Sequence, residues 1–388
     1  MKHSPVLLKN AAIISQNQTA EKKSILIQDN RISQILSENE IIDISSEQVF
    51  DLQDAELYAG FIDIHNHGAI GIDVNNANAD DLHKASKFLA AKGVTAWLPT
   101  LVPDTDENYA KTIKAIDQLM QTQDGREPAA RVLGVHYEGP FVSEKMCGAL
   151  RTQFFKSFKT GDEVENLPKL KNGIHLTTLA PEVENGIELI KELRKQDWIV
   201  SIGHTKADFQ TLENAFNAGA KHLTHFFNAM TGLHHREIGV VGWGLAKKEV
   251  TFDIIADGVH VHPQMLKFAF DYKTSENLIL ISDSVSPTGL GDGDFEIWGE
   301  KISVAGGKTQ NERGSIAGSV ITMLDAFKMF QSLGVSPSEI SKMASLNPAR
   351  LLGREQTHGS IKVGKRADLV AIDEKGNIKL VLIGGEKI

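Results

Sequence analysis

Residues 60–68 read GFIDIHNHG, an apolar run that ends in two histidines with one residue between them. Successive side chains of a β-strand point to opposite faces, so His65 and His67 project from the same side. Two imidazoles on one side of a strand end can bind one metal ion. A His-x-His pair alone is more often two packing or surface histidines. The other strand ends of the chain therefore decide whether a metal site is present.

The middle of the chain alternates between strand-like and helix-like segments. Helical patterns lie between most of the strands, as in residues 80–91, where apolar positions recur at helical spacing before Gly93. Eight strands alternating with helices over about 290 residues predict an α/β fold, a (β/α)8 TIM barrel. A doubly wound open sheet is the alternative, but the glycine-rich phosphate-binding motifs typical of such sheets do not occur. The eight candidate strands are residues 60–67, 94–100, 131–138, 173–179, 198–204, 222–225, 251–256 and 277–283.

The two ends of the chain have a different pattern. Short strand-like segments flank a hairpin turn at residues 29–30, and similar segments return after residue 358. We therefore predict a small β-sandwich domain formed from both termini, residues 1–58 and 358–388. The barrel is expected to span residues 59–357.

The composition limits which kinds of partner and which cellular compartment are expected for the protein. The chain has 388 residues, 41% of them hydrophobic, and a net charge of −9, which disfavours nucleic acid as the main partner. No stretch reaches about 18 uninterrupted apolar residues and the first residues lack a signal-peptide pattern, so we expect no membrane span. Cys147 is the only cysteine, which excludes an intrachain disulfide. A cytoplasmic location is the expectation.

Potential metal ligands follow the predicted strands at their carboxyl ends, where the active sites of such barrels lie. Four histidines and two carboxylates meet at this rim, and nitrogen and oxygen ligands without cysteine suit zinc, iron or manganese. Each residue also has a structural interpretation, as a core histidine, a buried acid or a helix cap. Their convergence favours a metal site. The six residues are His65, His67, Glu138, His204, His225 and Asp283.

Two further histidines lie near these strand ends. His136 shares its side of the strand with Glu138 and is a candidate partner of that carboxylate. His222 precedes His225 by three residues, so we expect it to lie outside the site.

The strand ends together resemble the amidohydrolase superfamily. The tail adds to the resemblance, since NPARLLG at 347–353 and GSIKVGKRADLV at 359–370 are similar to the passage from the barrel to the β domain in those enzymes. Some members carry a carboxylated lysine after the fourth strand. Residues 174–182 read IHLTTLAPE and contain no lysine, so this chain differs from that branch.

A narrower resemblance rests on four motifs that lie after barrel strands. They resemble the N-acetylglucosamine-6-phosphate deacetylase family, including its N-acetylgalactosamine-6-phosphate branch. The motifs are HYEGPF at 136–141, FNAMTG at 227–232, ADGVHVHP at 256–263 and GSIAGS at 314–319.

This resemblance implies a metal-dependent hydrolase that removes the acetyl group of an N-acetylhexosamine 6-phosphate. It implies that Glu138, His204 and His225 hold the main metal ion, and that His65 and His67 hold a second one with Glu138 as a bridge. Some members work with one ion, so one or two divalent ions are open, with zinc expected. Asp283 is implied as the catalytic base that then protonates the leaving nitrogen.

The resemblance also implies the substrate contacts and the assembly. Arg236 and His260 match phosphate-contacting positions, and members are typically homodimers in which the arginine loop reaches the neighbour's site. The phosphorylated amino sugar is thus the expected small-molecule partner. The implied substrate-binding residues are Ala149, Asn228, Ala229, Arg236, His260, Ile316, Ala317 and Gly318.

The loop after the third strand departs from the family pattern. Residues 147–151 read CGALR, so Leu150 stands where members usually have a histidine, and Arg151 is the candidate to replace its hydrogen bond. HHRE at 234–237 is similar to the galactosamine branch, which leaves gluco and galacto substrates open. The glycine-rich residues 289–294 are a lid candidate or an ordinary surface turn. A heterocycle deaminase of the same superfamily and a non-catalytic scaffold are the alternative functions.

Overall fold

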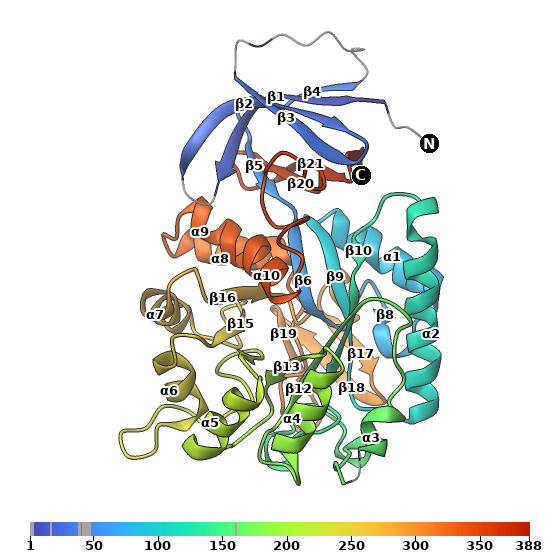
Figure 1. The fold of residues 1–388 in the computed structure, drawn as a ribbon, viewed down its shortest axis with the longest axis vertical. Coiled ribbons are helices and arrows are strands. Elements are labelled where there is room, and N and C mark those ends of the chain that lie inside the picture. The colour runs from blue at the N-terminus through green and yellow to red at the C-terminus, as the bar shows by residue number, and fades with distance from the viewer. Residues whose placement is uncertain (1–3, 16–17, 38–39, 41–47, 160) are drawn as a thin grey trace.

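The computed structural model describes residues 4–15, 18–37, 40, 48–159 and 161–388. Figure 1 shows a parallel barrel with helices around it, and above it a layered β structure made by the two ends of the chain. Among the described residues, no helix has the length and apolar character needed to cross a bilayer.

The barrel strands pair in chain order, and every pairing is parallel, as predicted. The last strand meets the first through backbone hydrogen bonds from Asp283 N to His65 O (2.9 Å) and from His67 N to Ser284 O (2.8 Å). The barrel closes through residues of the site itself. The strands are β6 (Phe61–Asn66), β9 (Val94–Leu101), β11 (Gly134–Glu138), β12 (Ile174–Leu179), β13 (Ile199–Ile202), β14 (His222–Leu223), β15 (Thr251–Ile255) and β16 (Leu278–Ile281), with β10 (Arg131–Val132) as a third partner of β9.

The strands alternate between two apolar layers. On β6, Ile62 and Ile64 belong to the core inside the barrel, whereas Phe61 packs in the layer between strands and helices. The outer layer consists of long helices with a buried apolar face. They are α1 (Ala79–Ala90), α2 (Asp106–Thr122), α4 (Gly186–Lys195), α5 (Phe209–Ala218), α6 (Gly239–Ala246), α7 (Pro263–Lys273) and α8 (Met323–Ser332), with the short α3 (Asp162–Glu165), α9 (Pro337–Ser341) and α10 (Asn347–Leu351).

The helix ends follow local sequence signals. Asn78 caps α1 with a reciprocal capping box to Asp81, and Asp208 accepts a hydrogen bond from Thr211 N (2.8 Å) at the start of α5. Gly219 ends α5 with a φ of 111°, a conformation that suits glycine.

Both termini contribute to one continuous sheet with a hydrophobic core of its own. Its order is β22-β21-β20-β5-β1-β2-β3, with β4 paired to β1, and Figure 1 shows β1–β3 above β20 and β21. The predicted turn holds Asp29 and Asn30 at φ 48° and 63°. The division of the chain at residues 58 and 358 stays a prediction. The strands are β1 (Val6–Ser15), β2 (Gln18–Gln28), β3 (Arg31–Ser37), β4 (Val49–Asp51), β5 (Glu56–Ala59), β20 (Leu369–Ile372), β21 (Ile378–Ile383) and β22 (Glu386–Lys387).

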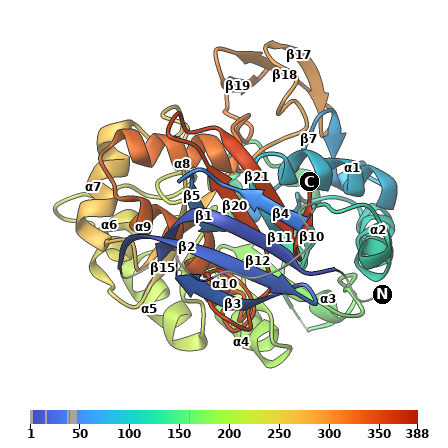
Figure 2. The same ribbon diagram turned by 90° about the horizontal axis from the view of Figure 1, so that it is seen from above.

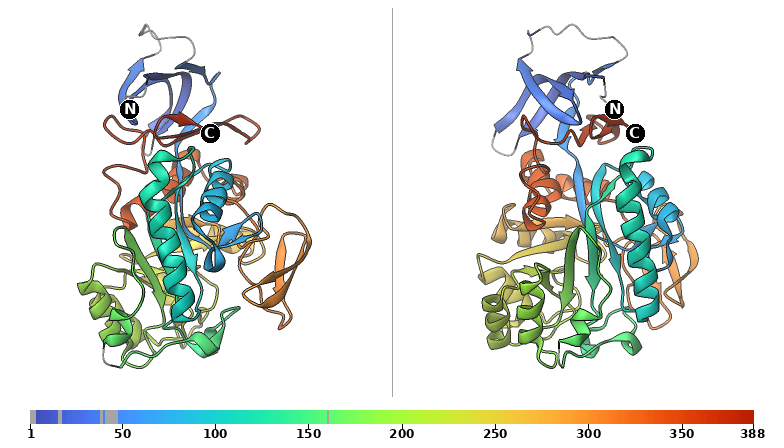
Figure 3. Two further views of the ribbon diagram at one scale, coloured as in Figure 1. Left: turned by 90° about the vertical axis from the view of Figure 1, so that its right-hand side faces the viewer. Right: turned by 45° about the vertical axis from the view of Figure 1, so that its right-hand side comes forward.

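A three-stranded antiparallel sheet follows the last barrel strand and was not predicted. It consists of β17 (Gly293–Ile297), β18 (Glu300–Ala305) and β19 (Lys308–Asn311), and it projects from the side of the barrel in Figures 2 and 3. Of the glycine-rich residues 289–294, the last two are the first residues of β17. A small hairpin of β7 (Gly68–Ala69) and β8 (Ile72–Asp73) follows β6.

Candidate metal centre and substrate pocket

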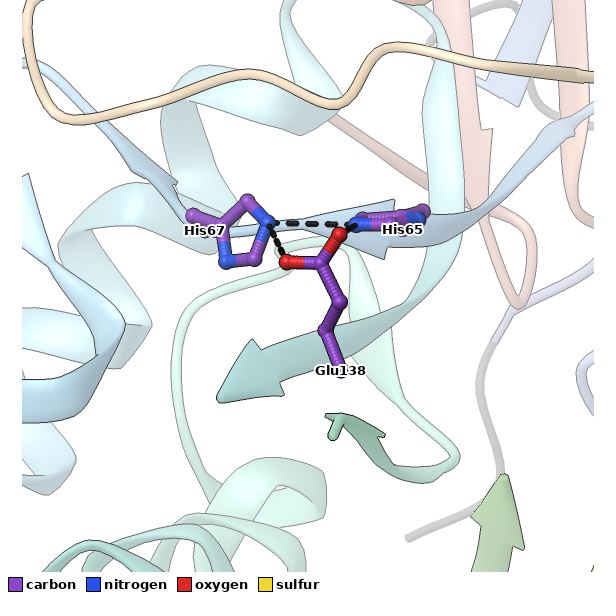
Figure 4. Close-up of side chains that lie close together, drawn as sticks. All are labelled: His65, His67 and Glu138. Atoms are coloured by element: carbon purple, nitrogen blue, oxygen red, sulfur yellow. Dashed lines mark hydrogen bonds and ion pairs between the residues drawn. The ribbon is translucent and has the colours of Figure 1, made fainter. Parts of the chain in front are cut away.

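The first group of potential ligands joins the end of β6 to the end of β11. Figure 4 shows the imidazoles of His65 and His67 turned towards the carboxylate of Glu138. The two Nε2 atoms lie 3.1 Å apart. His67 Nε2 lies 3.3 Å from Glu138 Oε2, and His65 Nε2 lies 3.6 Å from Glu138 Oε1. All three side chains are buried.

The second group uses the same carboxylate. Glu138 Oε1 lies 2.9 Å from His204 Nε2 and 3.0 Å from His225 Nε2, and these two nitrogens are 3.0 Å apart. His204 and His225 each lie two residues beyond the end of a strand, β13 and β14 respectively. The two groups of three residues therefore share Glu138, as the predicted bridging role requires.

The donor atoms fit a divalent metal in either group. Ligand atoms about 2.0 Å from a tetrahedral zinc ion lie about 3.3 Å from each other, and the separations found here are close to this. Two of the four far ring nitrogens, those of His204 and His67, support the same interpretation. His204 Nδ1 can donate to Met146 O (2.8 Å) and His67 Nδ1 to Thr100 O (3.2 Å), which leaves each Nε2 with a free lone pair.

The pKa values of the clustered side chains are shifted by their burial and by their charged neighbours. Although burial opposes ionisation, the hydrogen bonds with His204 and His225 hold the pKa of Glu138 well below its usual range. Burial also opposes protonation of His67, but Asp283 and Glu138 raise its pKa to about 10. In the same way Glu138 and Asp283 raise the pKa of His225 to about 9 against the effect of burial. Nearby positive charge thus stabilises the ionised carboxylates, and a bound divalent ion would also supply such charge.

Asp283 lies beside the first ligand group. Its Oδ1 atom is 3.4 Å from His65 Nε2 and 3.3 Å from His67 Nε2, and the side chain is buried. The barrel therefore brings together all six predicted rim residues.

Three of the rim residues have left-handed backbone conformations. The φ angles are 46° at His204, 33° at His225 and 49° at Asp283. Residues other than glycine rarely adopt this region, and surrounding contacts must hold them there. One such contact is the short hydrogen bond from His225 N to Asp253 Oδ1 (2.5 Å).

Two buried aspartates that the sequence did not single out position the ligand strands. Asp253 also accepts from His222 Nε2 (3.0 Å), so His222 lies behind the rim. Asp63 accepts from Ser282 Oγ (2.6 Å) and Asn66 Nδ2 (3.0 Å) and links β6 to the end of β16. A carboxylate inside an apolar strand was the available signal, because such groups are rarely buried without partners.

His136 does not act as a partner of the Glu138 carboxylate. Its Nε2 bonds to Thr178 Oγ1 (2.8 Å), and its ring packs against His65 with 4.6 Å between ring centroids. Burial lowers its pKa to about 3, so the imidazole is neutral and supports the ligand ring by packing.

A cavity of about 300 Å³ opens onto these residues. Of the predicted substrate residues, Ala317 is fully buried and does not line it. Arg236 lies on an exposed loop outside the cavity, with Nη1 2.7 Å from His235 Nε2. The predicted substrate residues that line the cavity are Ala149, Asn228, Ala229, His260, Ile316 and Gly318.

Two features of the cavity differ from expectation. Arg151 does not take the place of the histidine that Leu150 replaces, because its guanidinium pairs with Asp104 (2.8 Å) and donates to Pro103 O outside the cavity. Trp298, on the turn between β17 and β18, lines the cavity and was not predicted. In the sequence, a tryptophan beside a glycine is only a weak indication of a site residue. Trp298 reaches the rim because the sheet of β17–β19 folds back against the barrel.

The model of the amidohydrolase family matches residues 57–388. The chain therefore belongs to the amidohydrolase family.

The relatives narrow this class. An N-acetylglucosamine-6-phosphate deacetylase of Bacillus subtilis is 35% identical over 98% of this chain and 96% of its own length. An N-acetylgalactosamine-6-phosphate deacetylase of Escherichia coli O157:H7 is 37% identical over 86% and 88%. The crystal structure of N-acetylglucosamine-6-phosphate deacetylase from Pasteurella multocida aligns with a TM-score of 0.91 at 27% identity over 99% of both chains. Within the amidohydrolases, the chain groups with these N-acetylhexosamine-6-phosphate deacetylases, as the motifs indicated.

Proposed function

We propose that this protein hydrolyses the N-acetyl group of an N-acetylhexosamine 6-phosphate, releasing acetate and the amino sugar 6-phosphate in amino sugar catabolism. The observation that carries the proposal is the pair of ligand groups that share Glu138, with Asp283 beside them at a cavity of sugar size. The relatives' names favour this reaction over deamination of a heterocycle. The intact ligand set argues against a non-catalytic scaffold.

The chemistry of amide hydrolysis assigns the roles. A divalent ion held by Glu138, His204 and His225, with His65 and His67 available for a second, would polarise the amide carbonyl and lower the pKa of water. Asp283 takes the proton of the attacking water and then delivers it to the departing nitrogen, because an amide anion is a very poor leaving group. Its carboxylate faces the ligand cluster and the cavity, where both transfers take place.

The sugar phosphate is assigned to three residues that line the cavity, Asn228, Ala229 and His260. His260 Nδ1 lies 2.6 Å from Asp257 Oδ2, which leaves Nε2 for the substrate. Although burial acts in the opposite direction, the hydrogen bond with His260 lowers the pKa of Asp257, so an ionised carboxylate holds the His260 ring in place beside the cavity.

A homodimer would explain the position of Arg236. Its loop carries the exposed Leu233, and the exposed face of α7 presents Met265, Phe268 and Tyr272, which are 41%, 45% and 59% exposed. Apolar side chains at this spacing on one helix face are typical of an interface. We propose that two copies meet through this face and that Arg236 contacts the partner's phosphate. Sedimentation of the protein and of Phe268→Glu tests this, with a dimer expected only for the unchanged chain.

Zinc and a cytoplasmic location complete the proposal. Histidine and carboxylate ligands in a closed group of three suit zinc, and iron or manganese are the competitors. Metal analysis of the purified protein separates these ions. Cys147 is a free thiol, so the fold does not depend on an oxidising compartment.

The deciding experiment measures acetate release from N-acetylglucosamine 6-phosphate and N-acetylgalactosamine 6-phosphate in parallel. The unphosphorylated sugars serve as controls. We expect turnover of at least one phosphorylated sugar and much slower turnover without the phosphate. Equal rates with and without phosphate would remove the roles given to His260 and Arg236.

A further inference from the structure

One side of the cavity is an apolar wall. Leu150 and Trp298 both line the cavity and are only 3% and 9% exposed. They belong to a separate hydrophobic cluster that joins the loop after β11 to the sheet of β17–β19. Asn228 and His260 also line this cavity, so its lining includes polar groups as well as apolar ones.

The wall stands next to the reacting groups. The Trp298 ring packs edge-on against His67 with 5.3 Å between ring centroids, and His67 is in turn 3.3 Å from Asp283. The scissile carbonyl has to lie beside these groups. The amide has only two substituents, and the proposed function assigns the sugar phosphate to the polar lining residues Asn228 and His260. The acyl chain is therefore left facing Trp298 and Leu150.

The wall is also held in place. Trp298 Nε1 donates to Asp73 Oδ1 (3.3 Å), and Arg313 ties the insertion to the loop of Leu150 by donating to Ala149 O (3.2 Å) while pairing with Glu300 (3.0 Å). A longer acyl chain would have to displace these contacts, whereas a methyl group only has to touch the two side chains.

We propose that Trp298 and Leu150 form the acyl-selecting wall of this enzyme, which fits an acetyl group and excludes longer acyl groups. The inference rests on the proposed deacetylase function and assigns the residues that limit its substrate. Trp298 also separates the cavity from a second, polar cavity of about 670 Å³ that is lined by Asp104, Lys111 and Arg151. Shortening Trp298 therefore opens the wall into existing space.

The experiment compares kcat/KM for the N-acetyl, N-propionyl and N-butyryl forms of the preferred hexosamine 6-phosphate. For the unchanged enzyme we expect a loss of at least about tenfold for each added carbon, the usual effect of one methylene in a fitted apolar pocket. Trp298→Ala is expected to raise the butyryl-to-acetyl ratio by about tenfold or more. Trp298→Phe keeps an aromatic ring against His67 and should give an intermediate ratio. Leu150→Ala should favour the propionyl form.

The matched control is Phe295→Ala, which removes a side chain of the same cluster that does not line the cavity. It should leave the ratios unchanged, and metal content is measured for every variant. The inference is overturned if the unchanged enzyme accepts butyryl and acetyl equally, or if Trp298→Ala with full metal content slows all three substrates by one factor. Failure of the unchanged enzyme to release any acid would instead overturn the proposed function together with the inference.

Discussion

The two histidine pairs on the rim reach the same carboxylate in different ways. β6 carries His65 in an extended strand, and His67 follows one residue after its end. His204 and His225 come after two short strands and have left-handed backbones. Their Nε2 atoms lie 2.9 and 3.0 Å from Glu138, against 3.6 and 3.3 Å for His65 and His67.

This difference separates two tasks. The pair that follows β13 and β14 makes the tighter group with Glu138. Both of these histidines have unfavourable left-handed backbone conformations, which surrounding contacts must hold in place. The pair on β6 lies closer to Asp283. We therefore expect His204 and His225 to determine metal retention, and His65 and His67 to determine how a second ion and Asp283 meet the substrate.

The largest effect is expected from Glu138→Ala, because Glu138 is common to both ligand groups. Metal content should fall to almost none, and kcat should drop by more than the change of any single histidine causes. Metal analysis and acetate release measure both. Full metal retention in Glu138→Ala would favour the deaminase-like arrangement, in which this glutamate is not a required ligand.

Asp283→Asn should come next. The variant keeps its metal, because Asp283 belongs to neither group of ligands, but kcat should fall by about 10²- to 10⁴-fold through loss of proton transfer. Steady-state kinetics with metal analysis test this. A fully active Asp283→Asn enzyme would contradict the proposed base.

The comparison of the two pairs is tested directly by His204→Ala and His65→Ala. His204→Ala should lose most of the metal, whereas His65→Ala should retain about one ion per chain, because the group of Glu138, His204 and His225 stays intact. Equal metal loss in both variants would remove the distinction between the pairs.

A smaller effect is expected from Asp253→Asn. Asp253 touches no substrate but holds the backbone N–H of His225 and the ring of His222. Metal affinity should fall by about 10- to 100-fold, as for other groups that orient a ligand. Competition with a chelator measures this affinity. Asp63→Asn, which acts through β6, should weaken the binding of only the second ion.

The smallest effect concerns a group outside the rim. Burial lowers the pKa of Lys273, on α7, to about 8. Between about pH 8 and 10.4 the unfolded chain then binds more protons than the folded one, so the free energy of unfolding should rise with pH. We expect about 1 kcal/mol, because the amino group keeps a hydrogen bond to Lys247 O and residual solvent contact. Denaturant unfolding at pH 8 and 10 tests this, and Lys273→Met should abolish the rise.

The sequence by itself determined the barrel and the six rim residues. Alternation and helical periodicity act over a few residues, and chain order places parallel strands side by side with their carboxyl ends together. His65, Glu138 and Asp283 could therefore be assigned to one rim although they are far apart in the chain. The motifs after these strands also indicated the family.

Only the tertiary structure decided what surrounds the candidate metal ligands. Trp298 reaches the cavity because an antiparallel insertion folds back against the rim, and Arg151 is drawn to Asp104 and away from the cavity. Asp253 and Asp63 are explained by hydrogen bonds to neighbouring strands. The path of a loop and the partner of a charged side chain depend on contacts between residues distant in sequence. No periodic pattern over a few residues reports such contacts. The ligand atoms follow from strand order, whereas the shape of the substrate wall follows from packing.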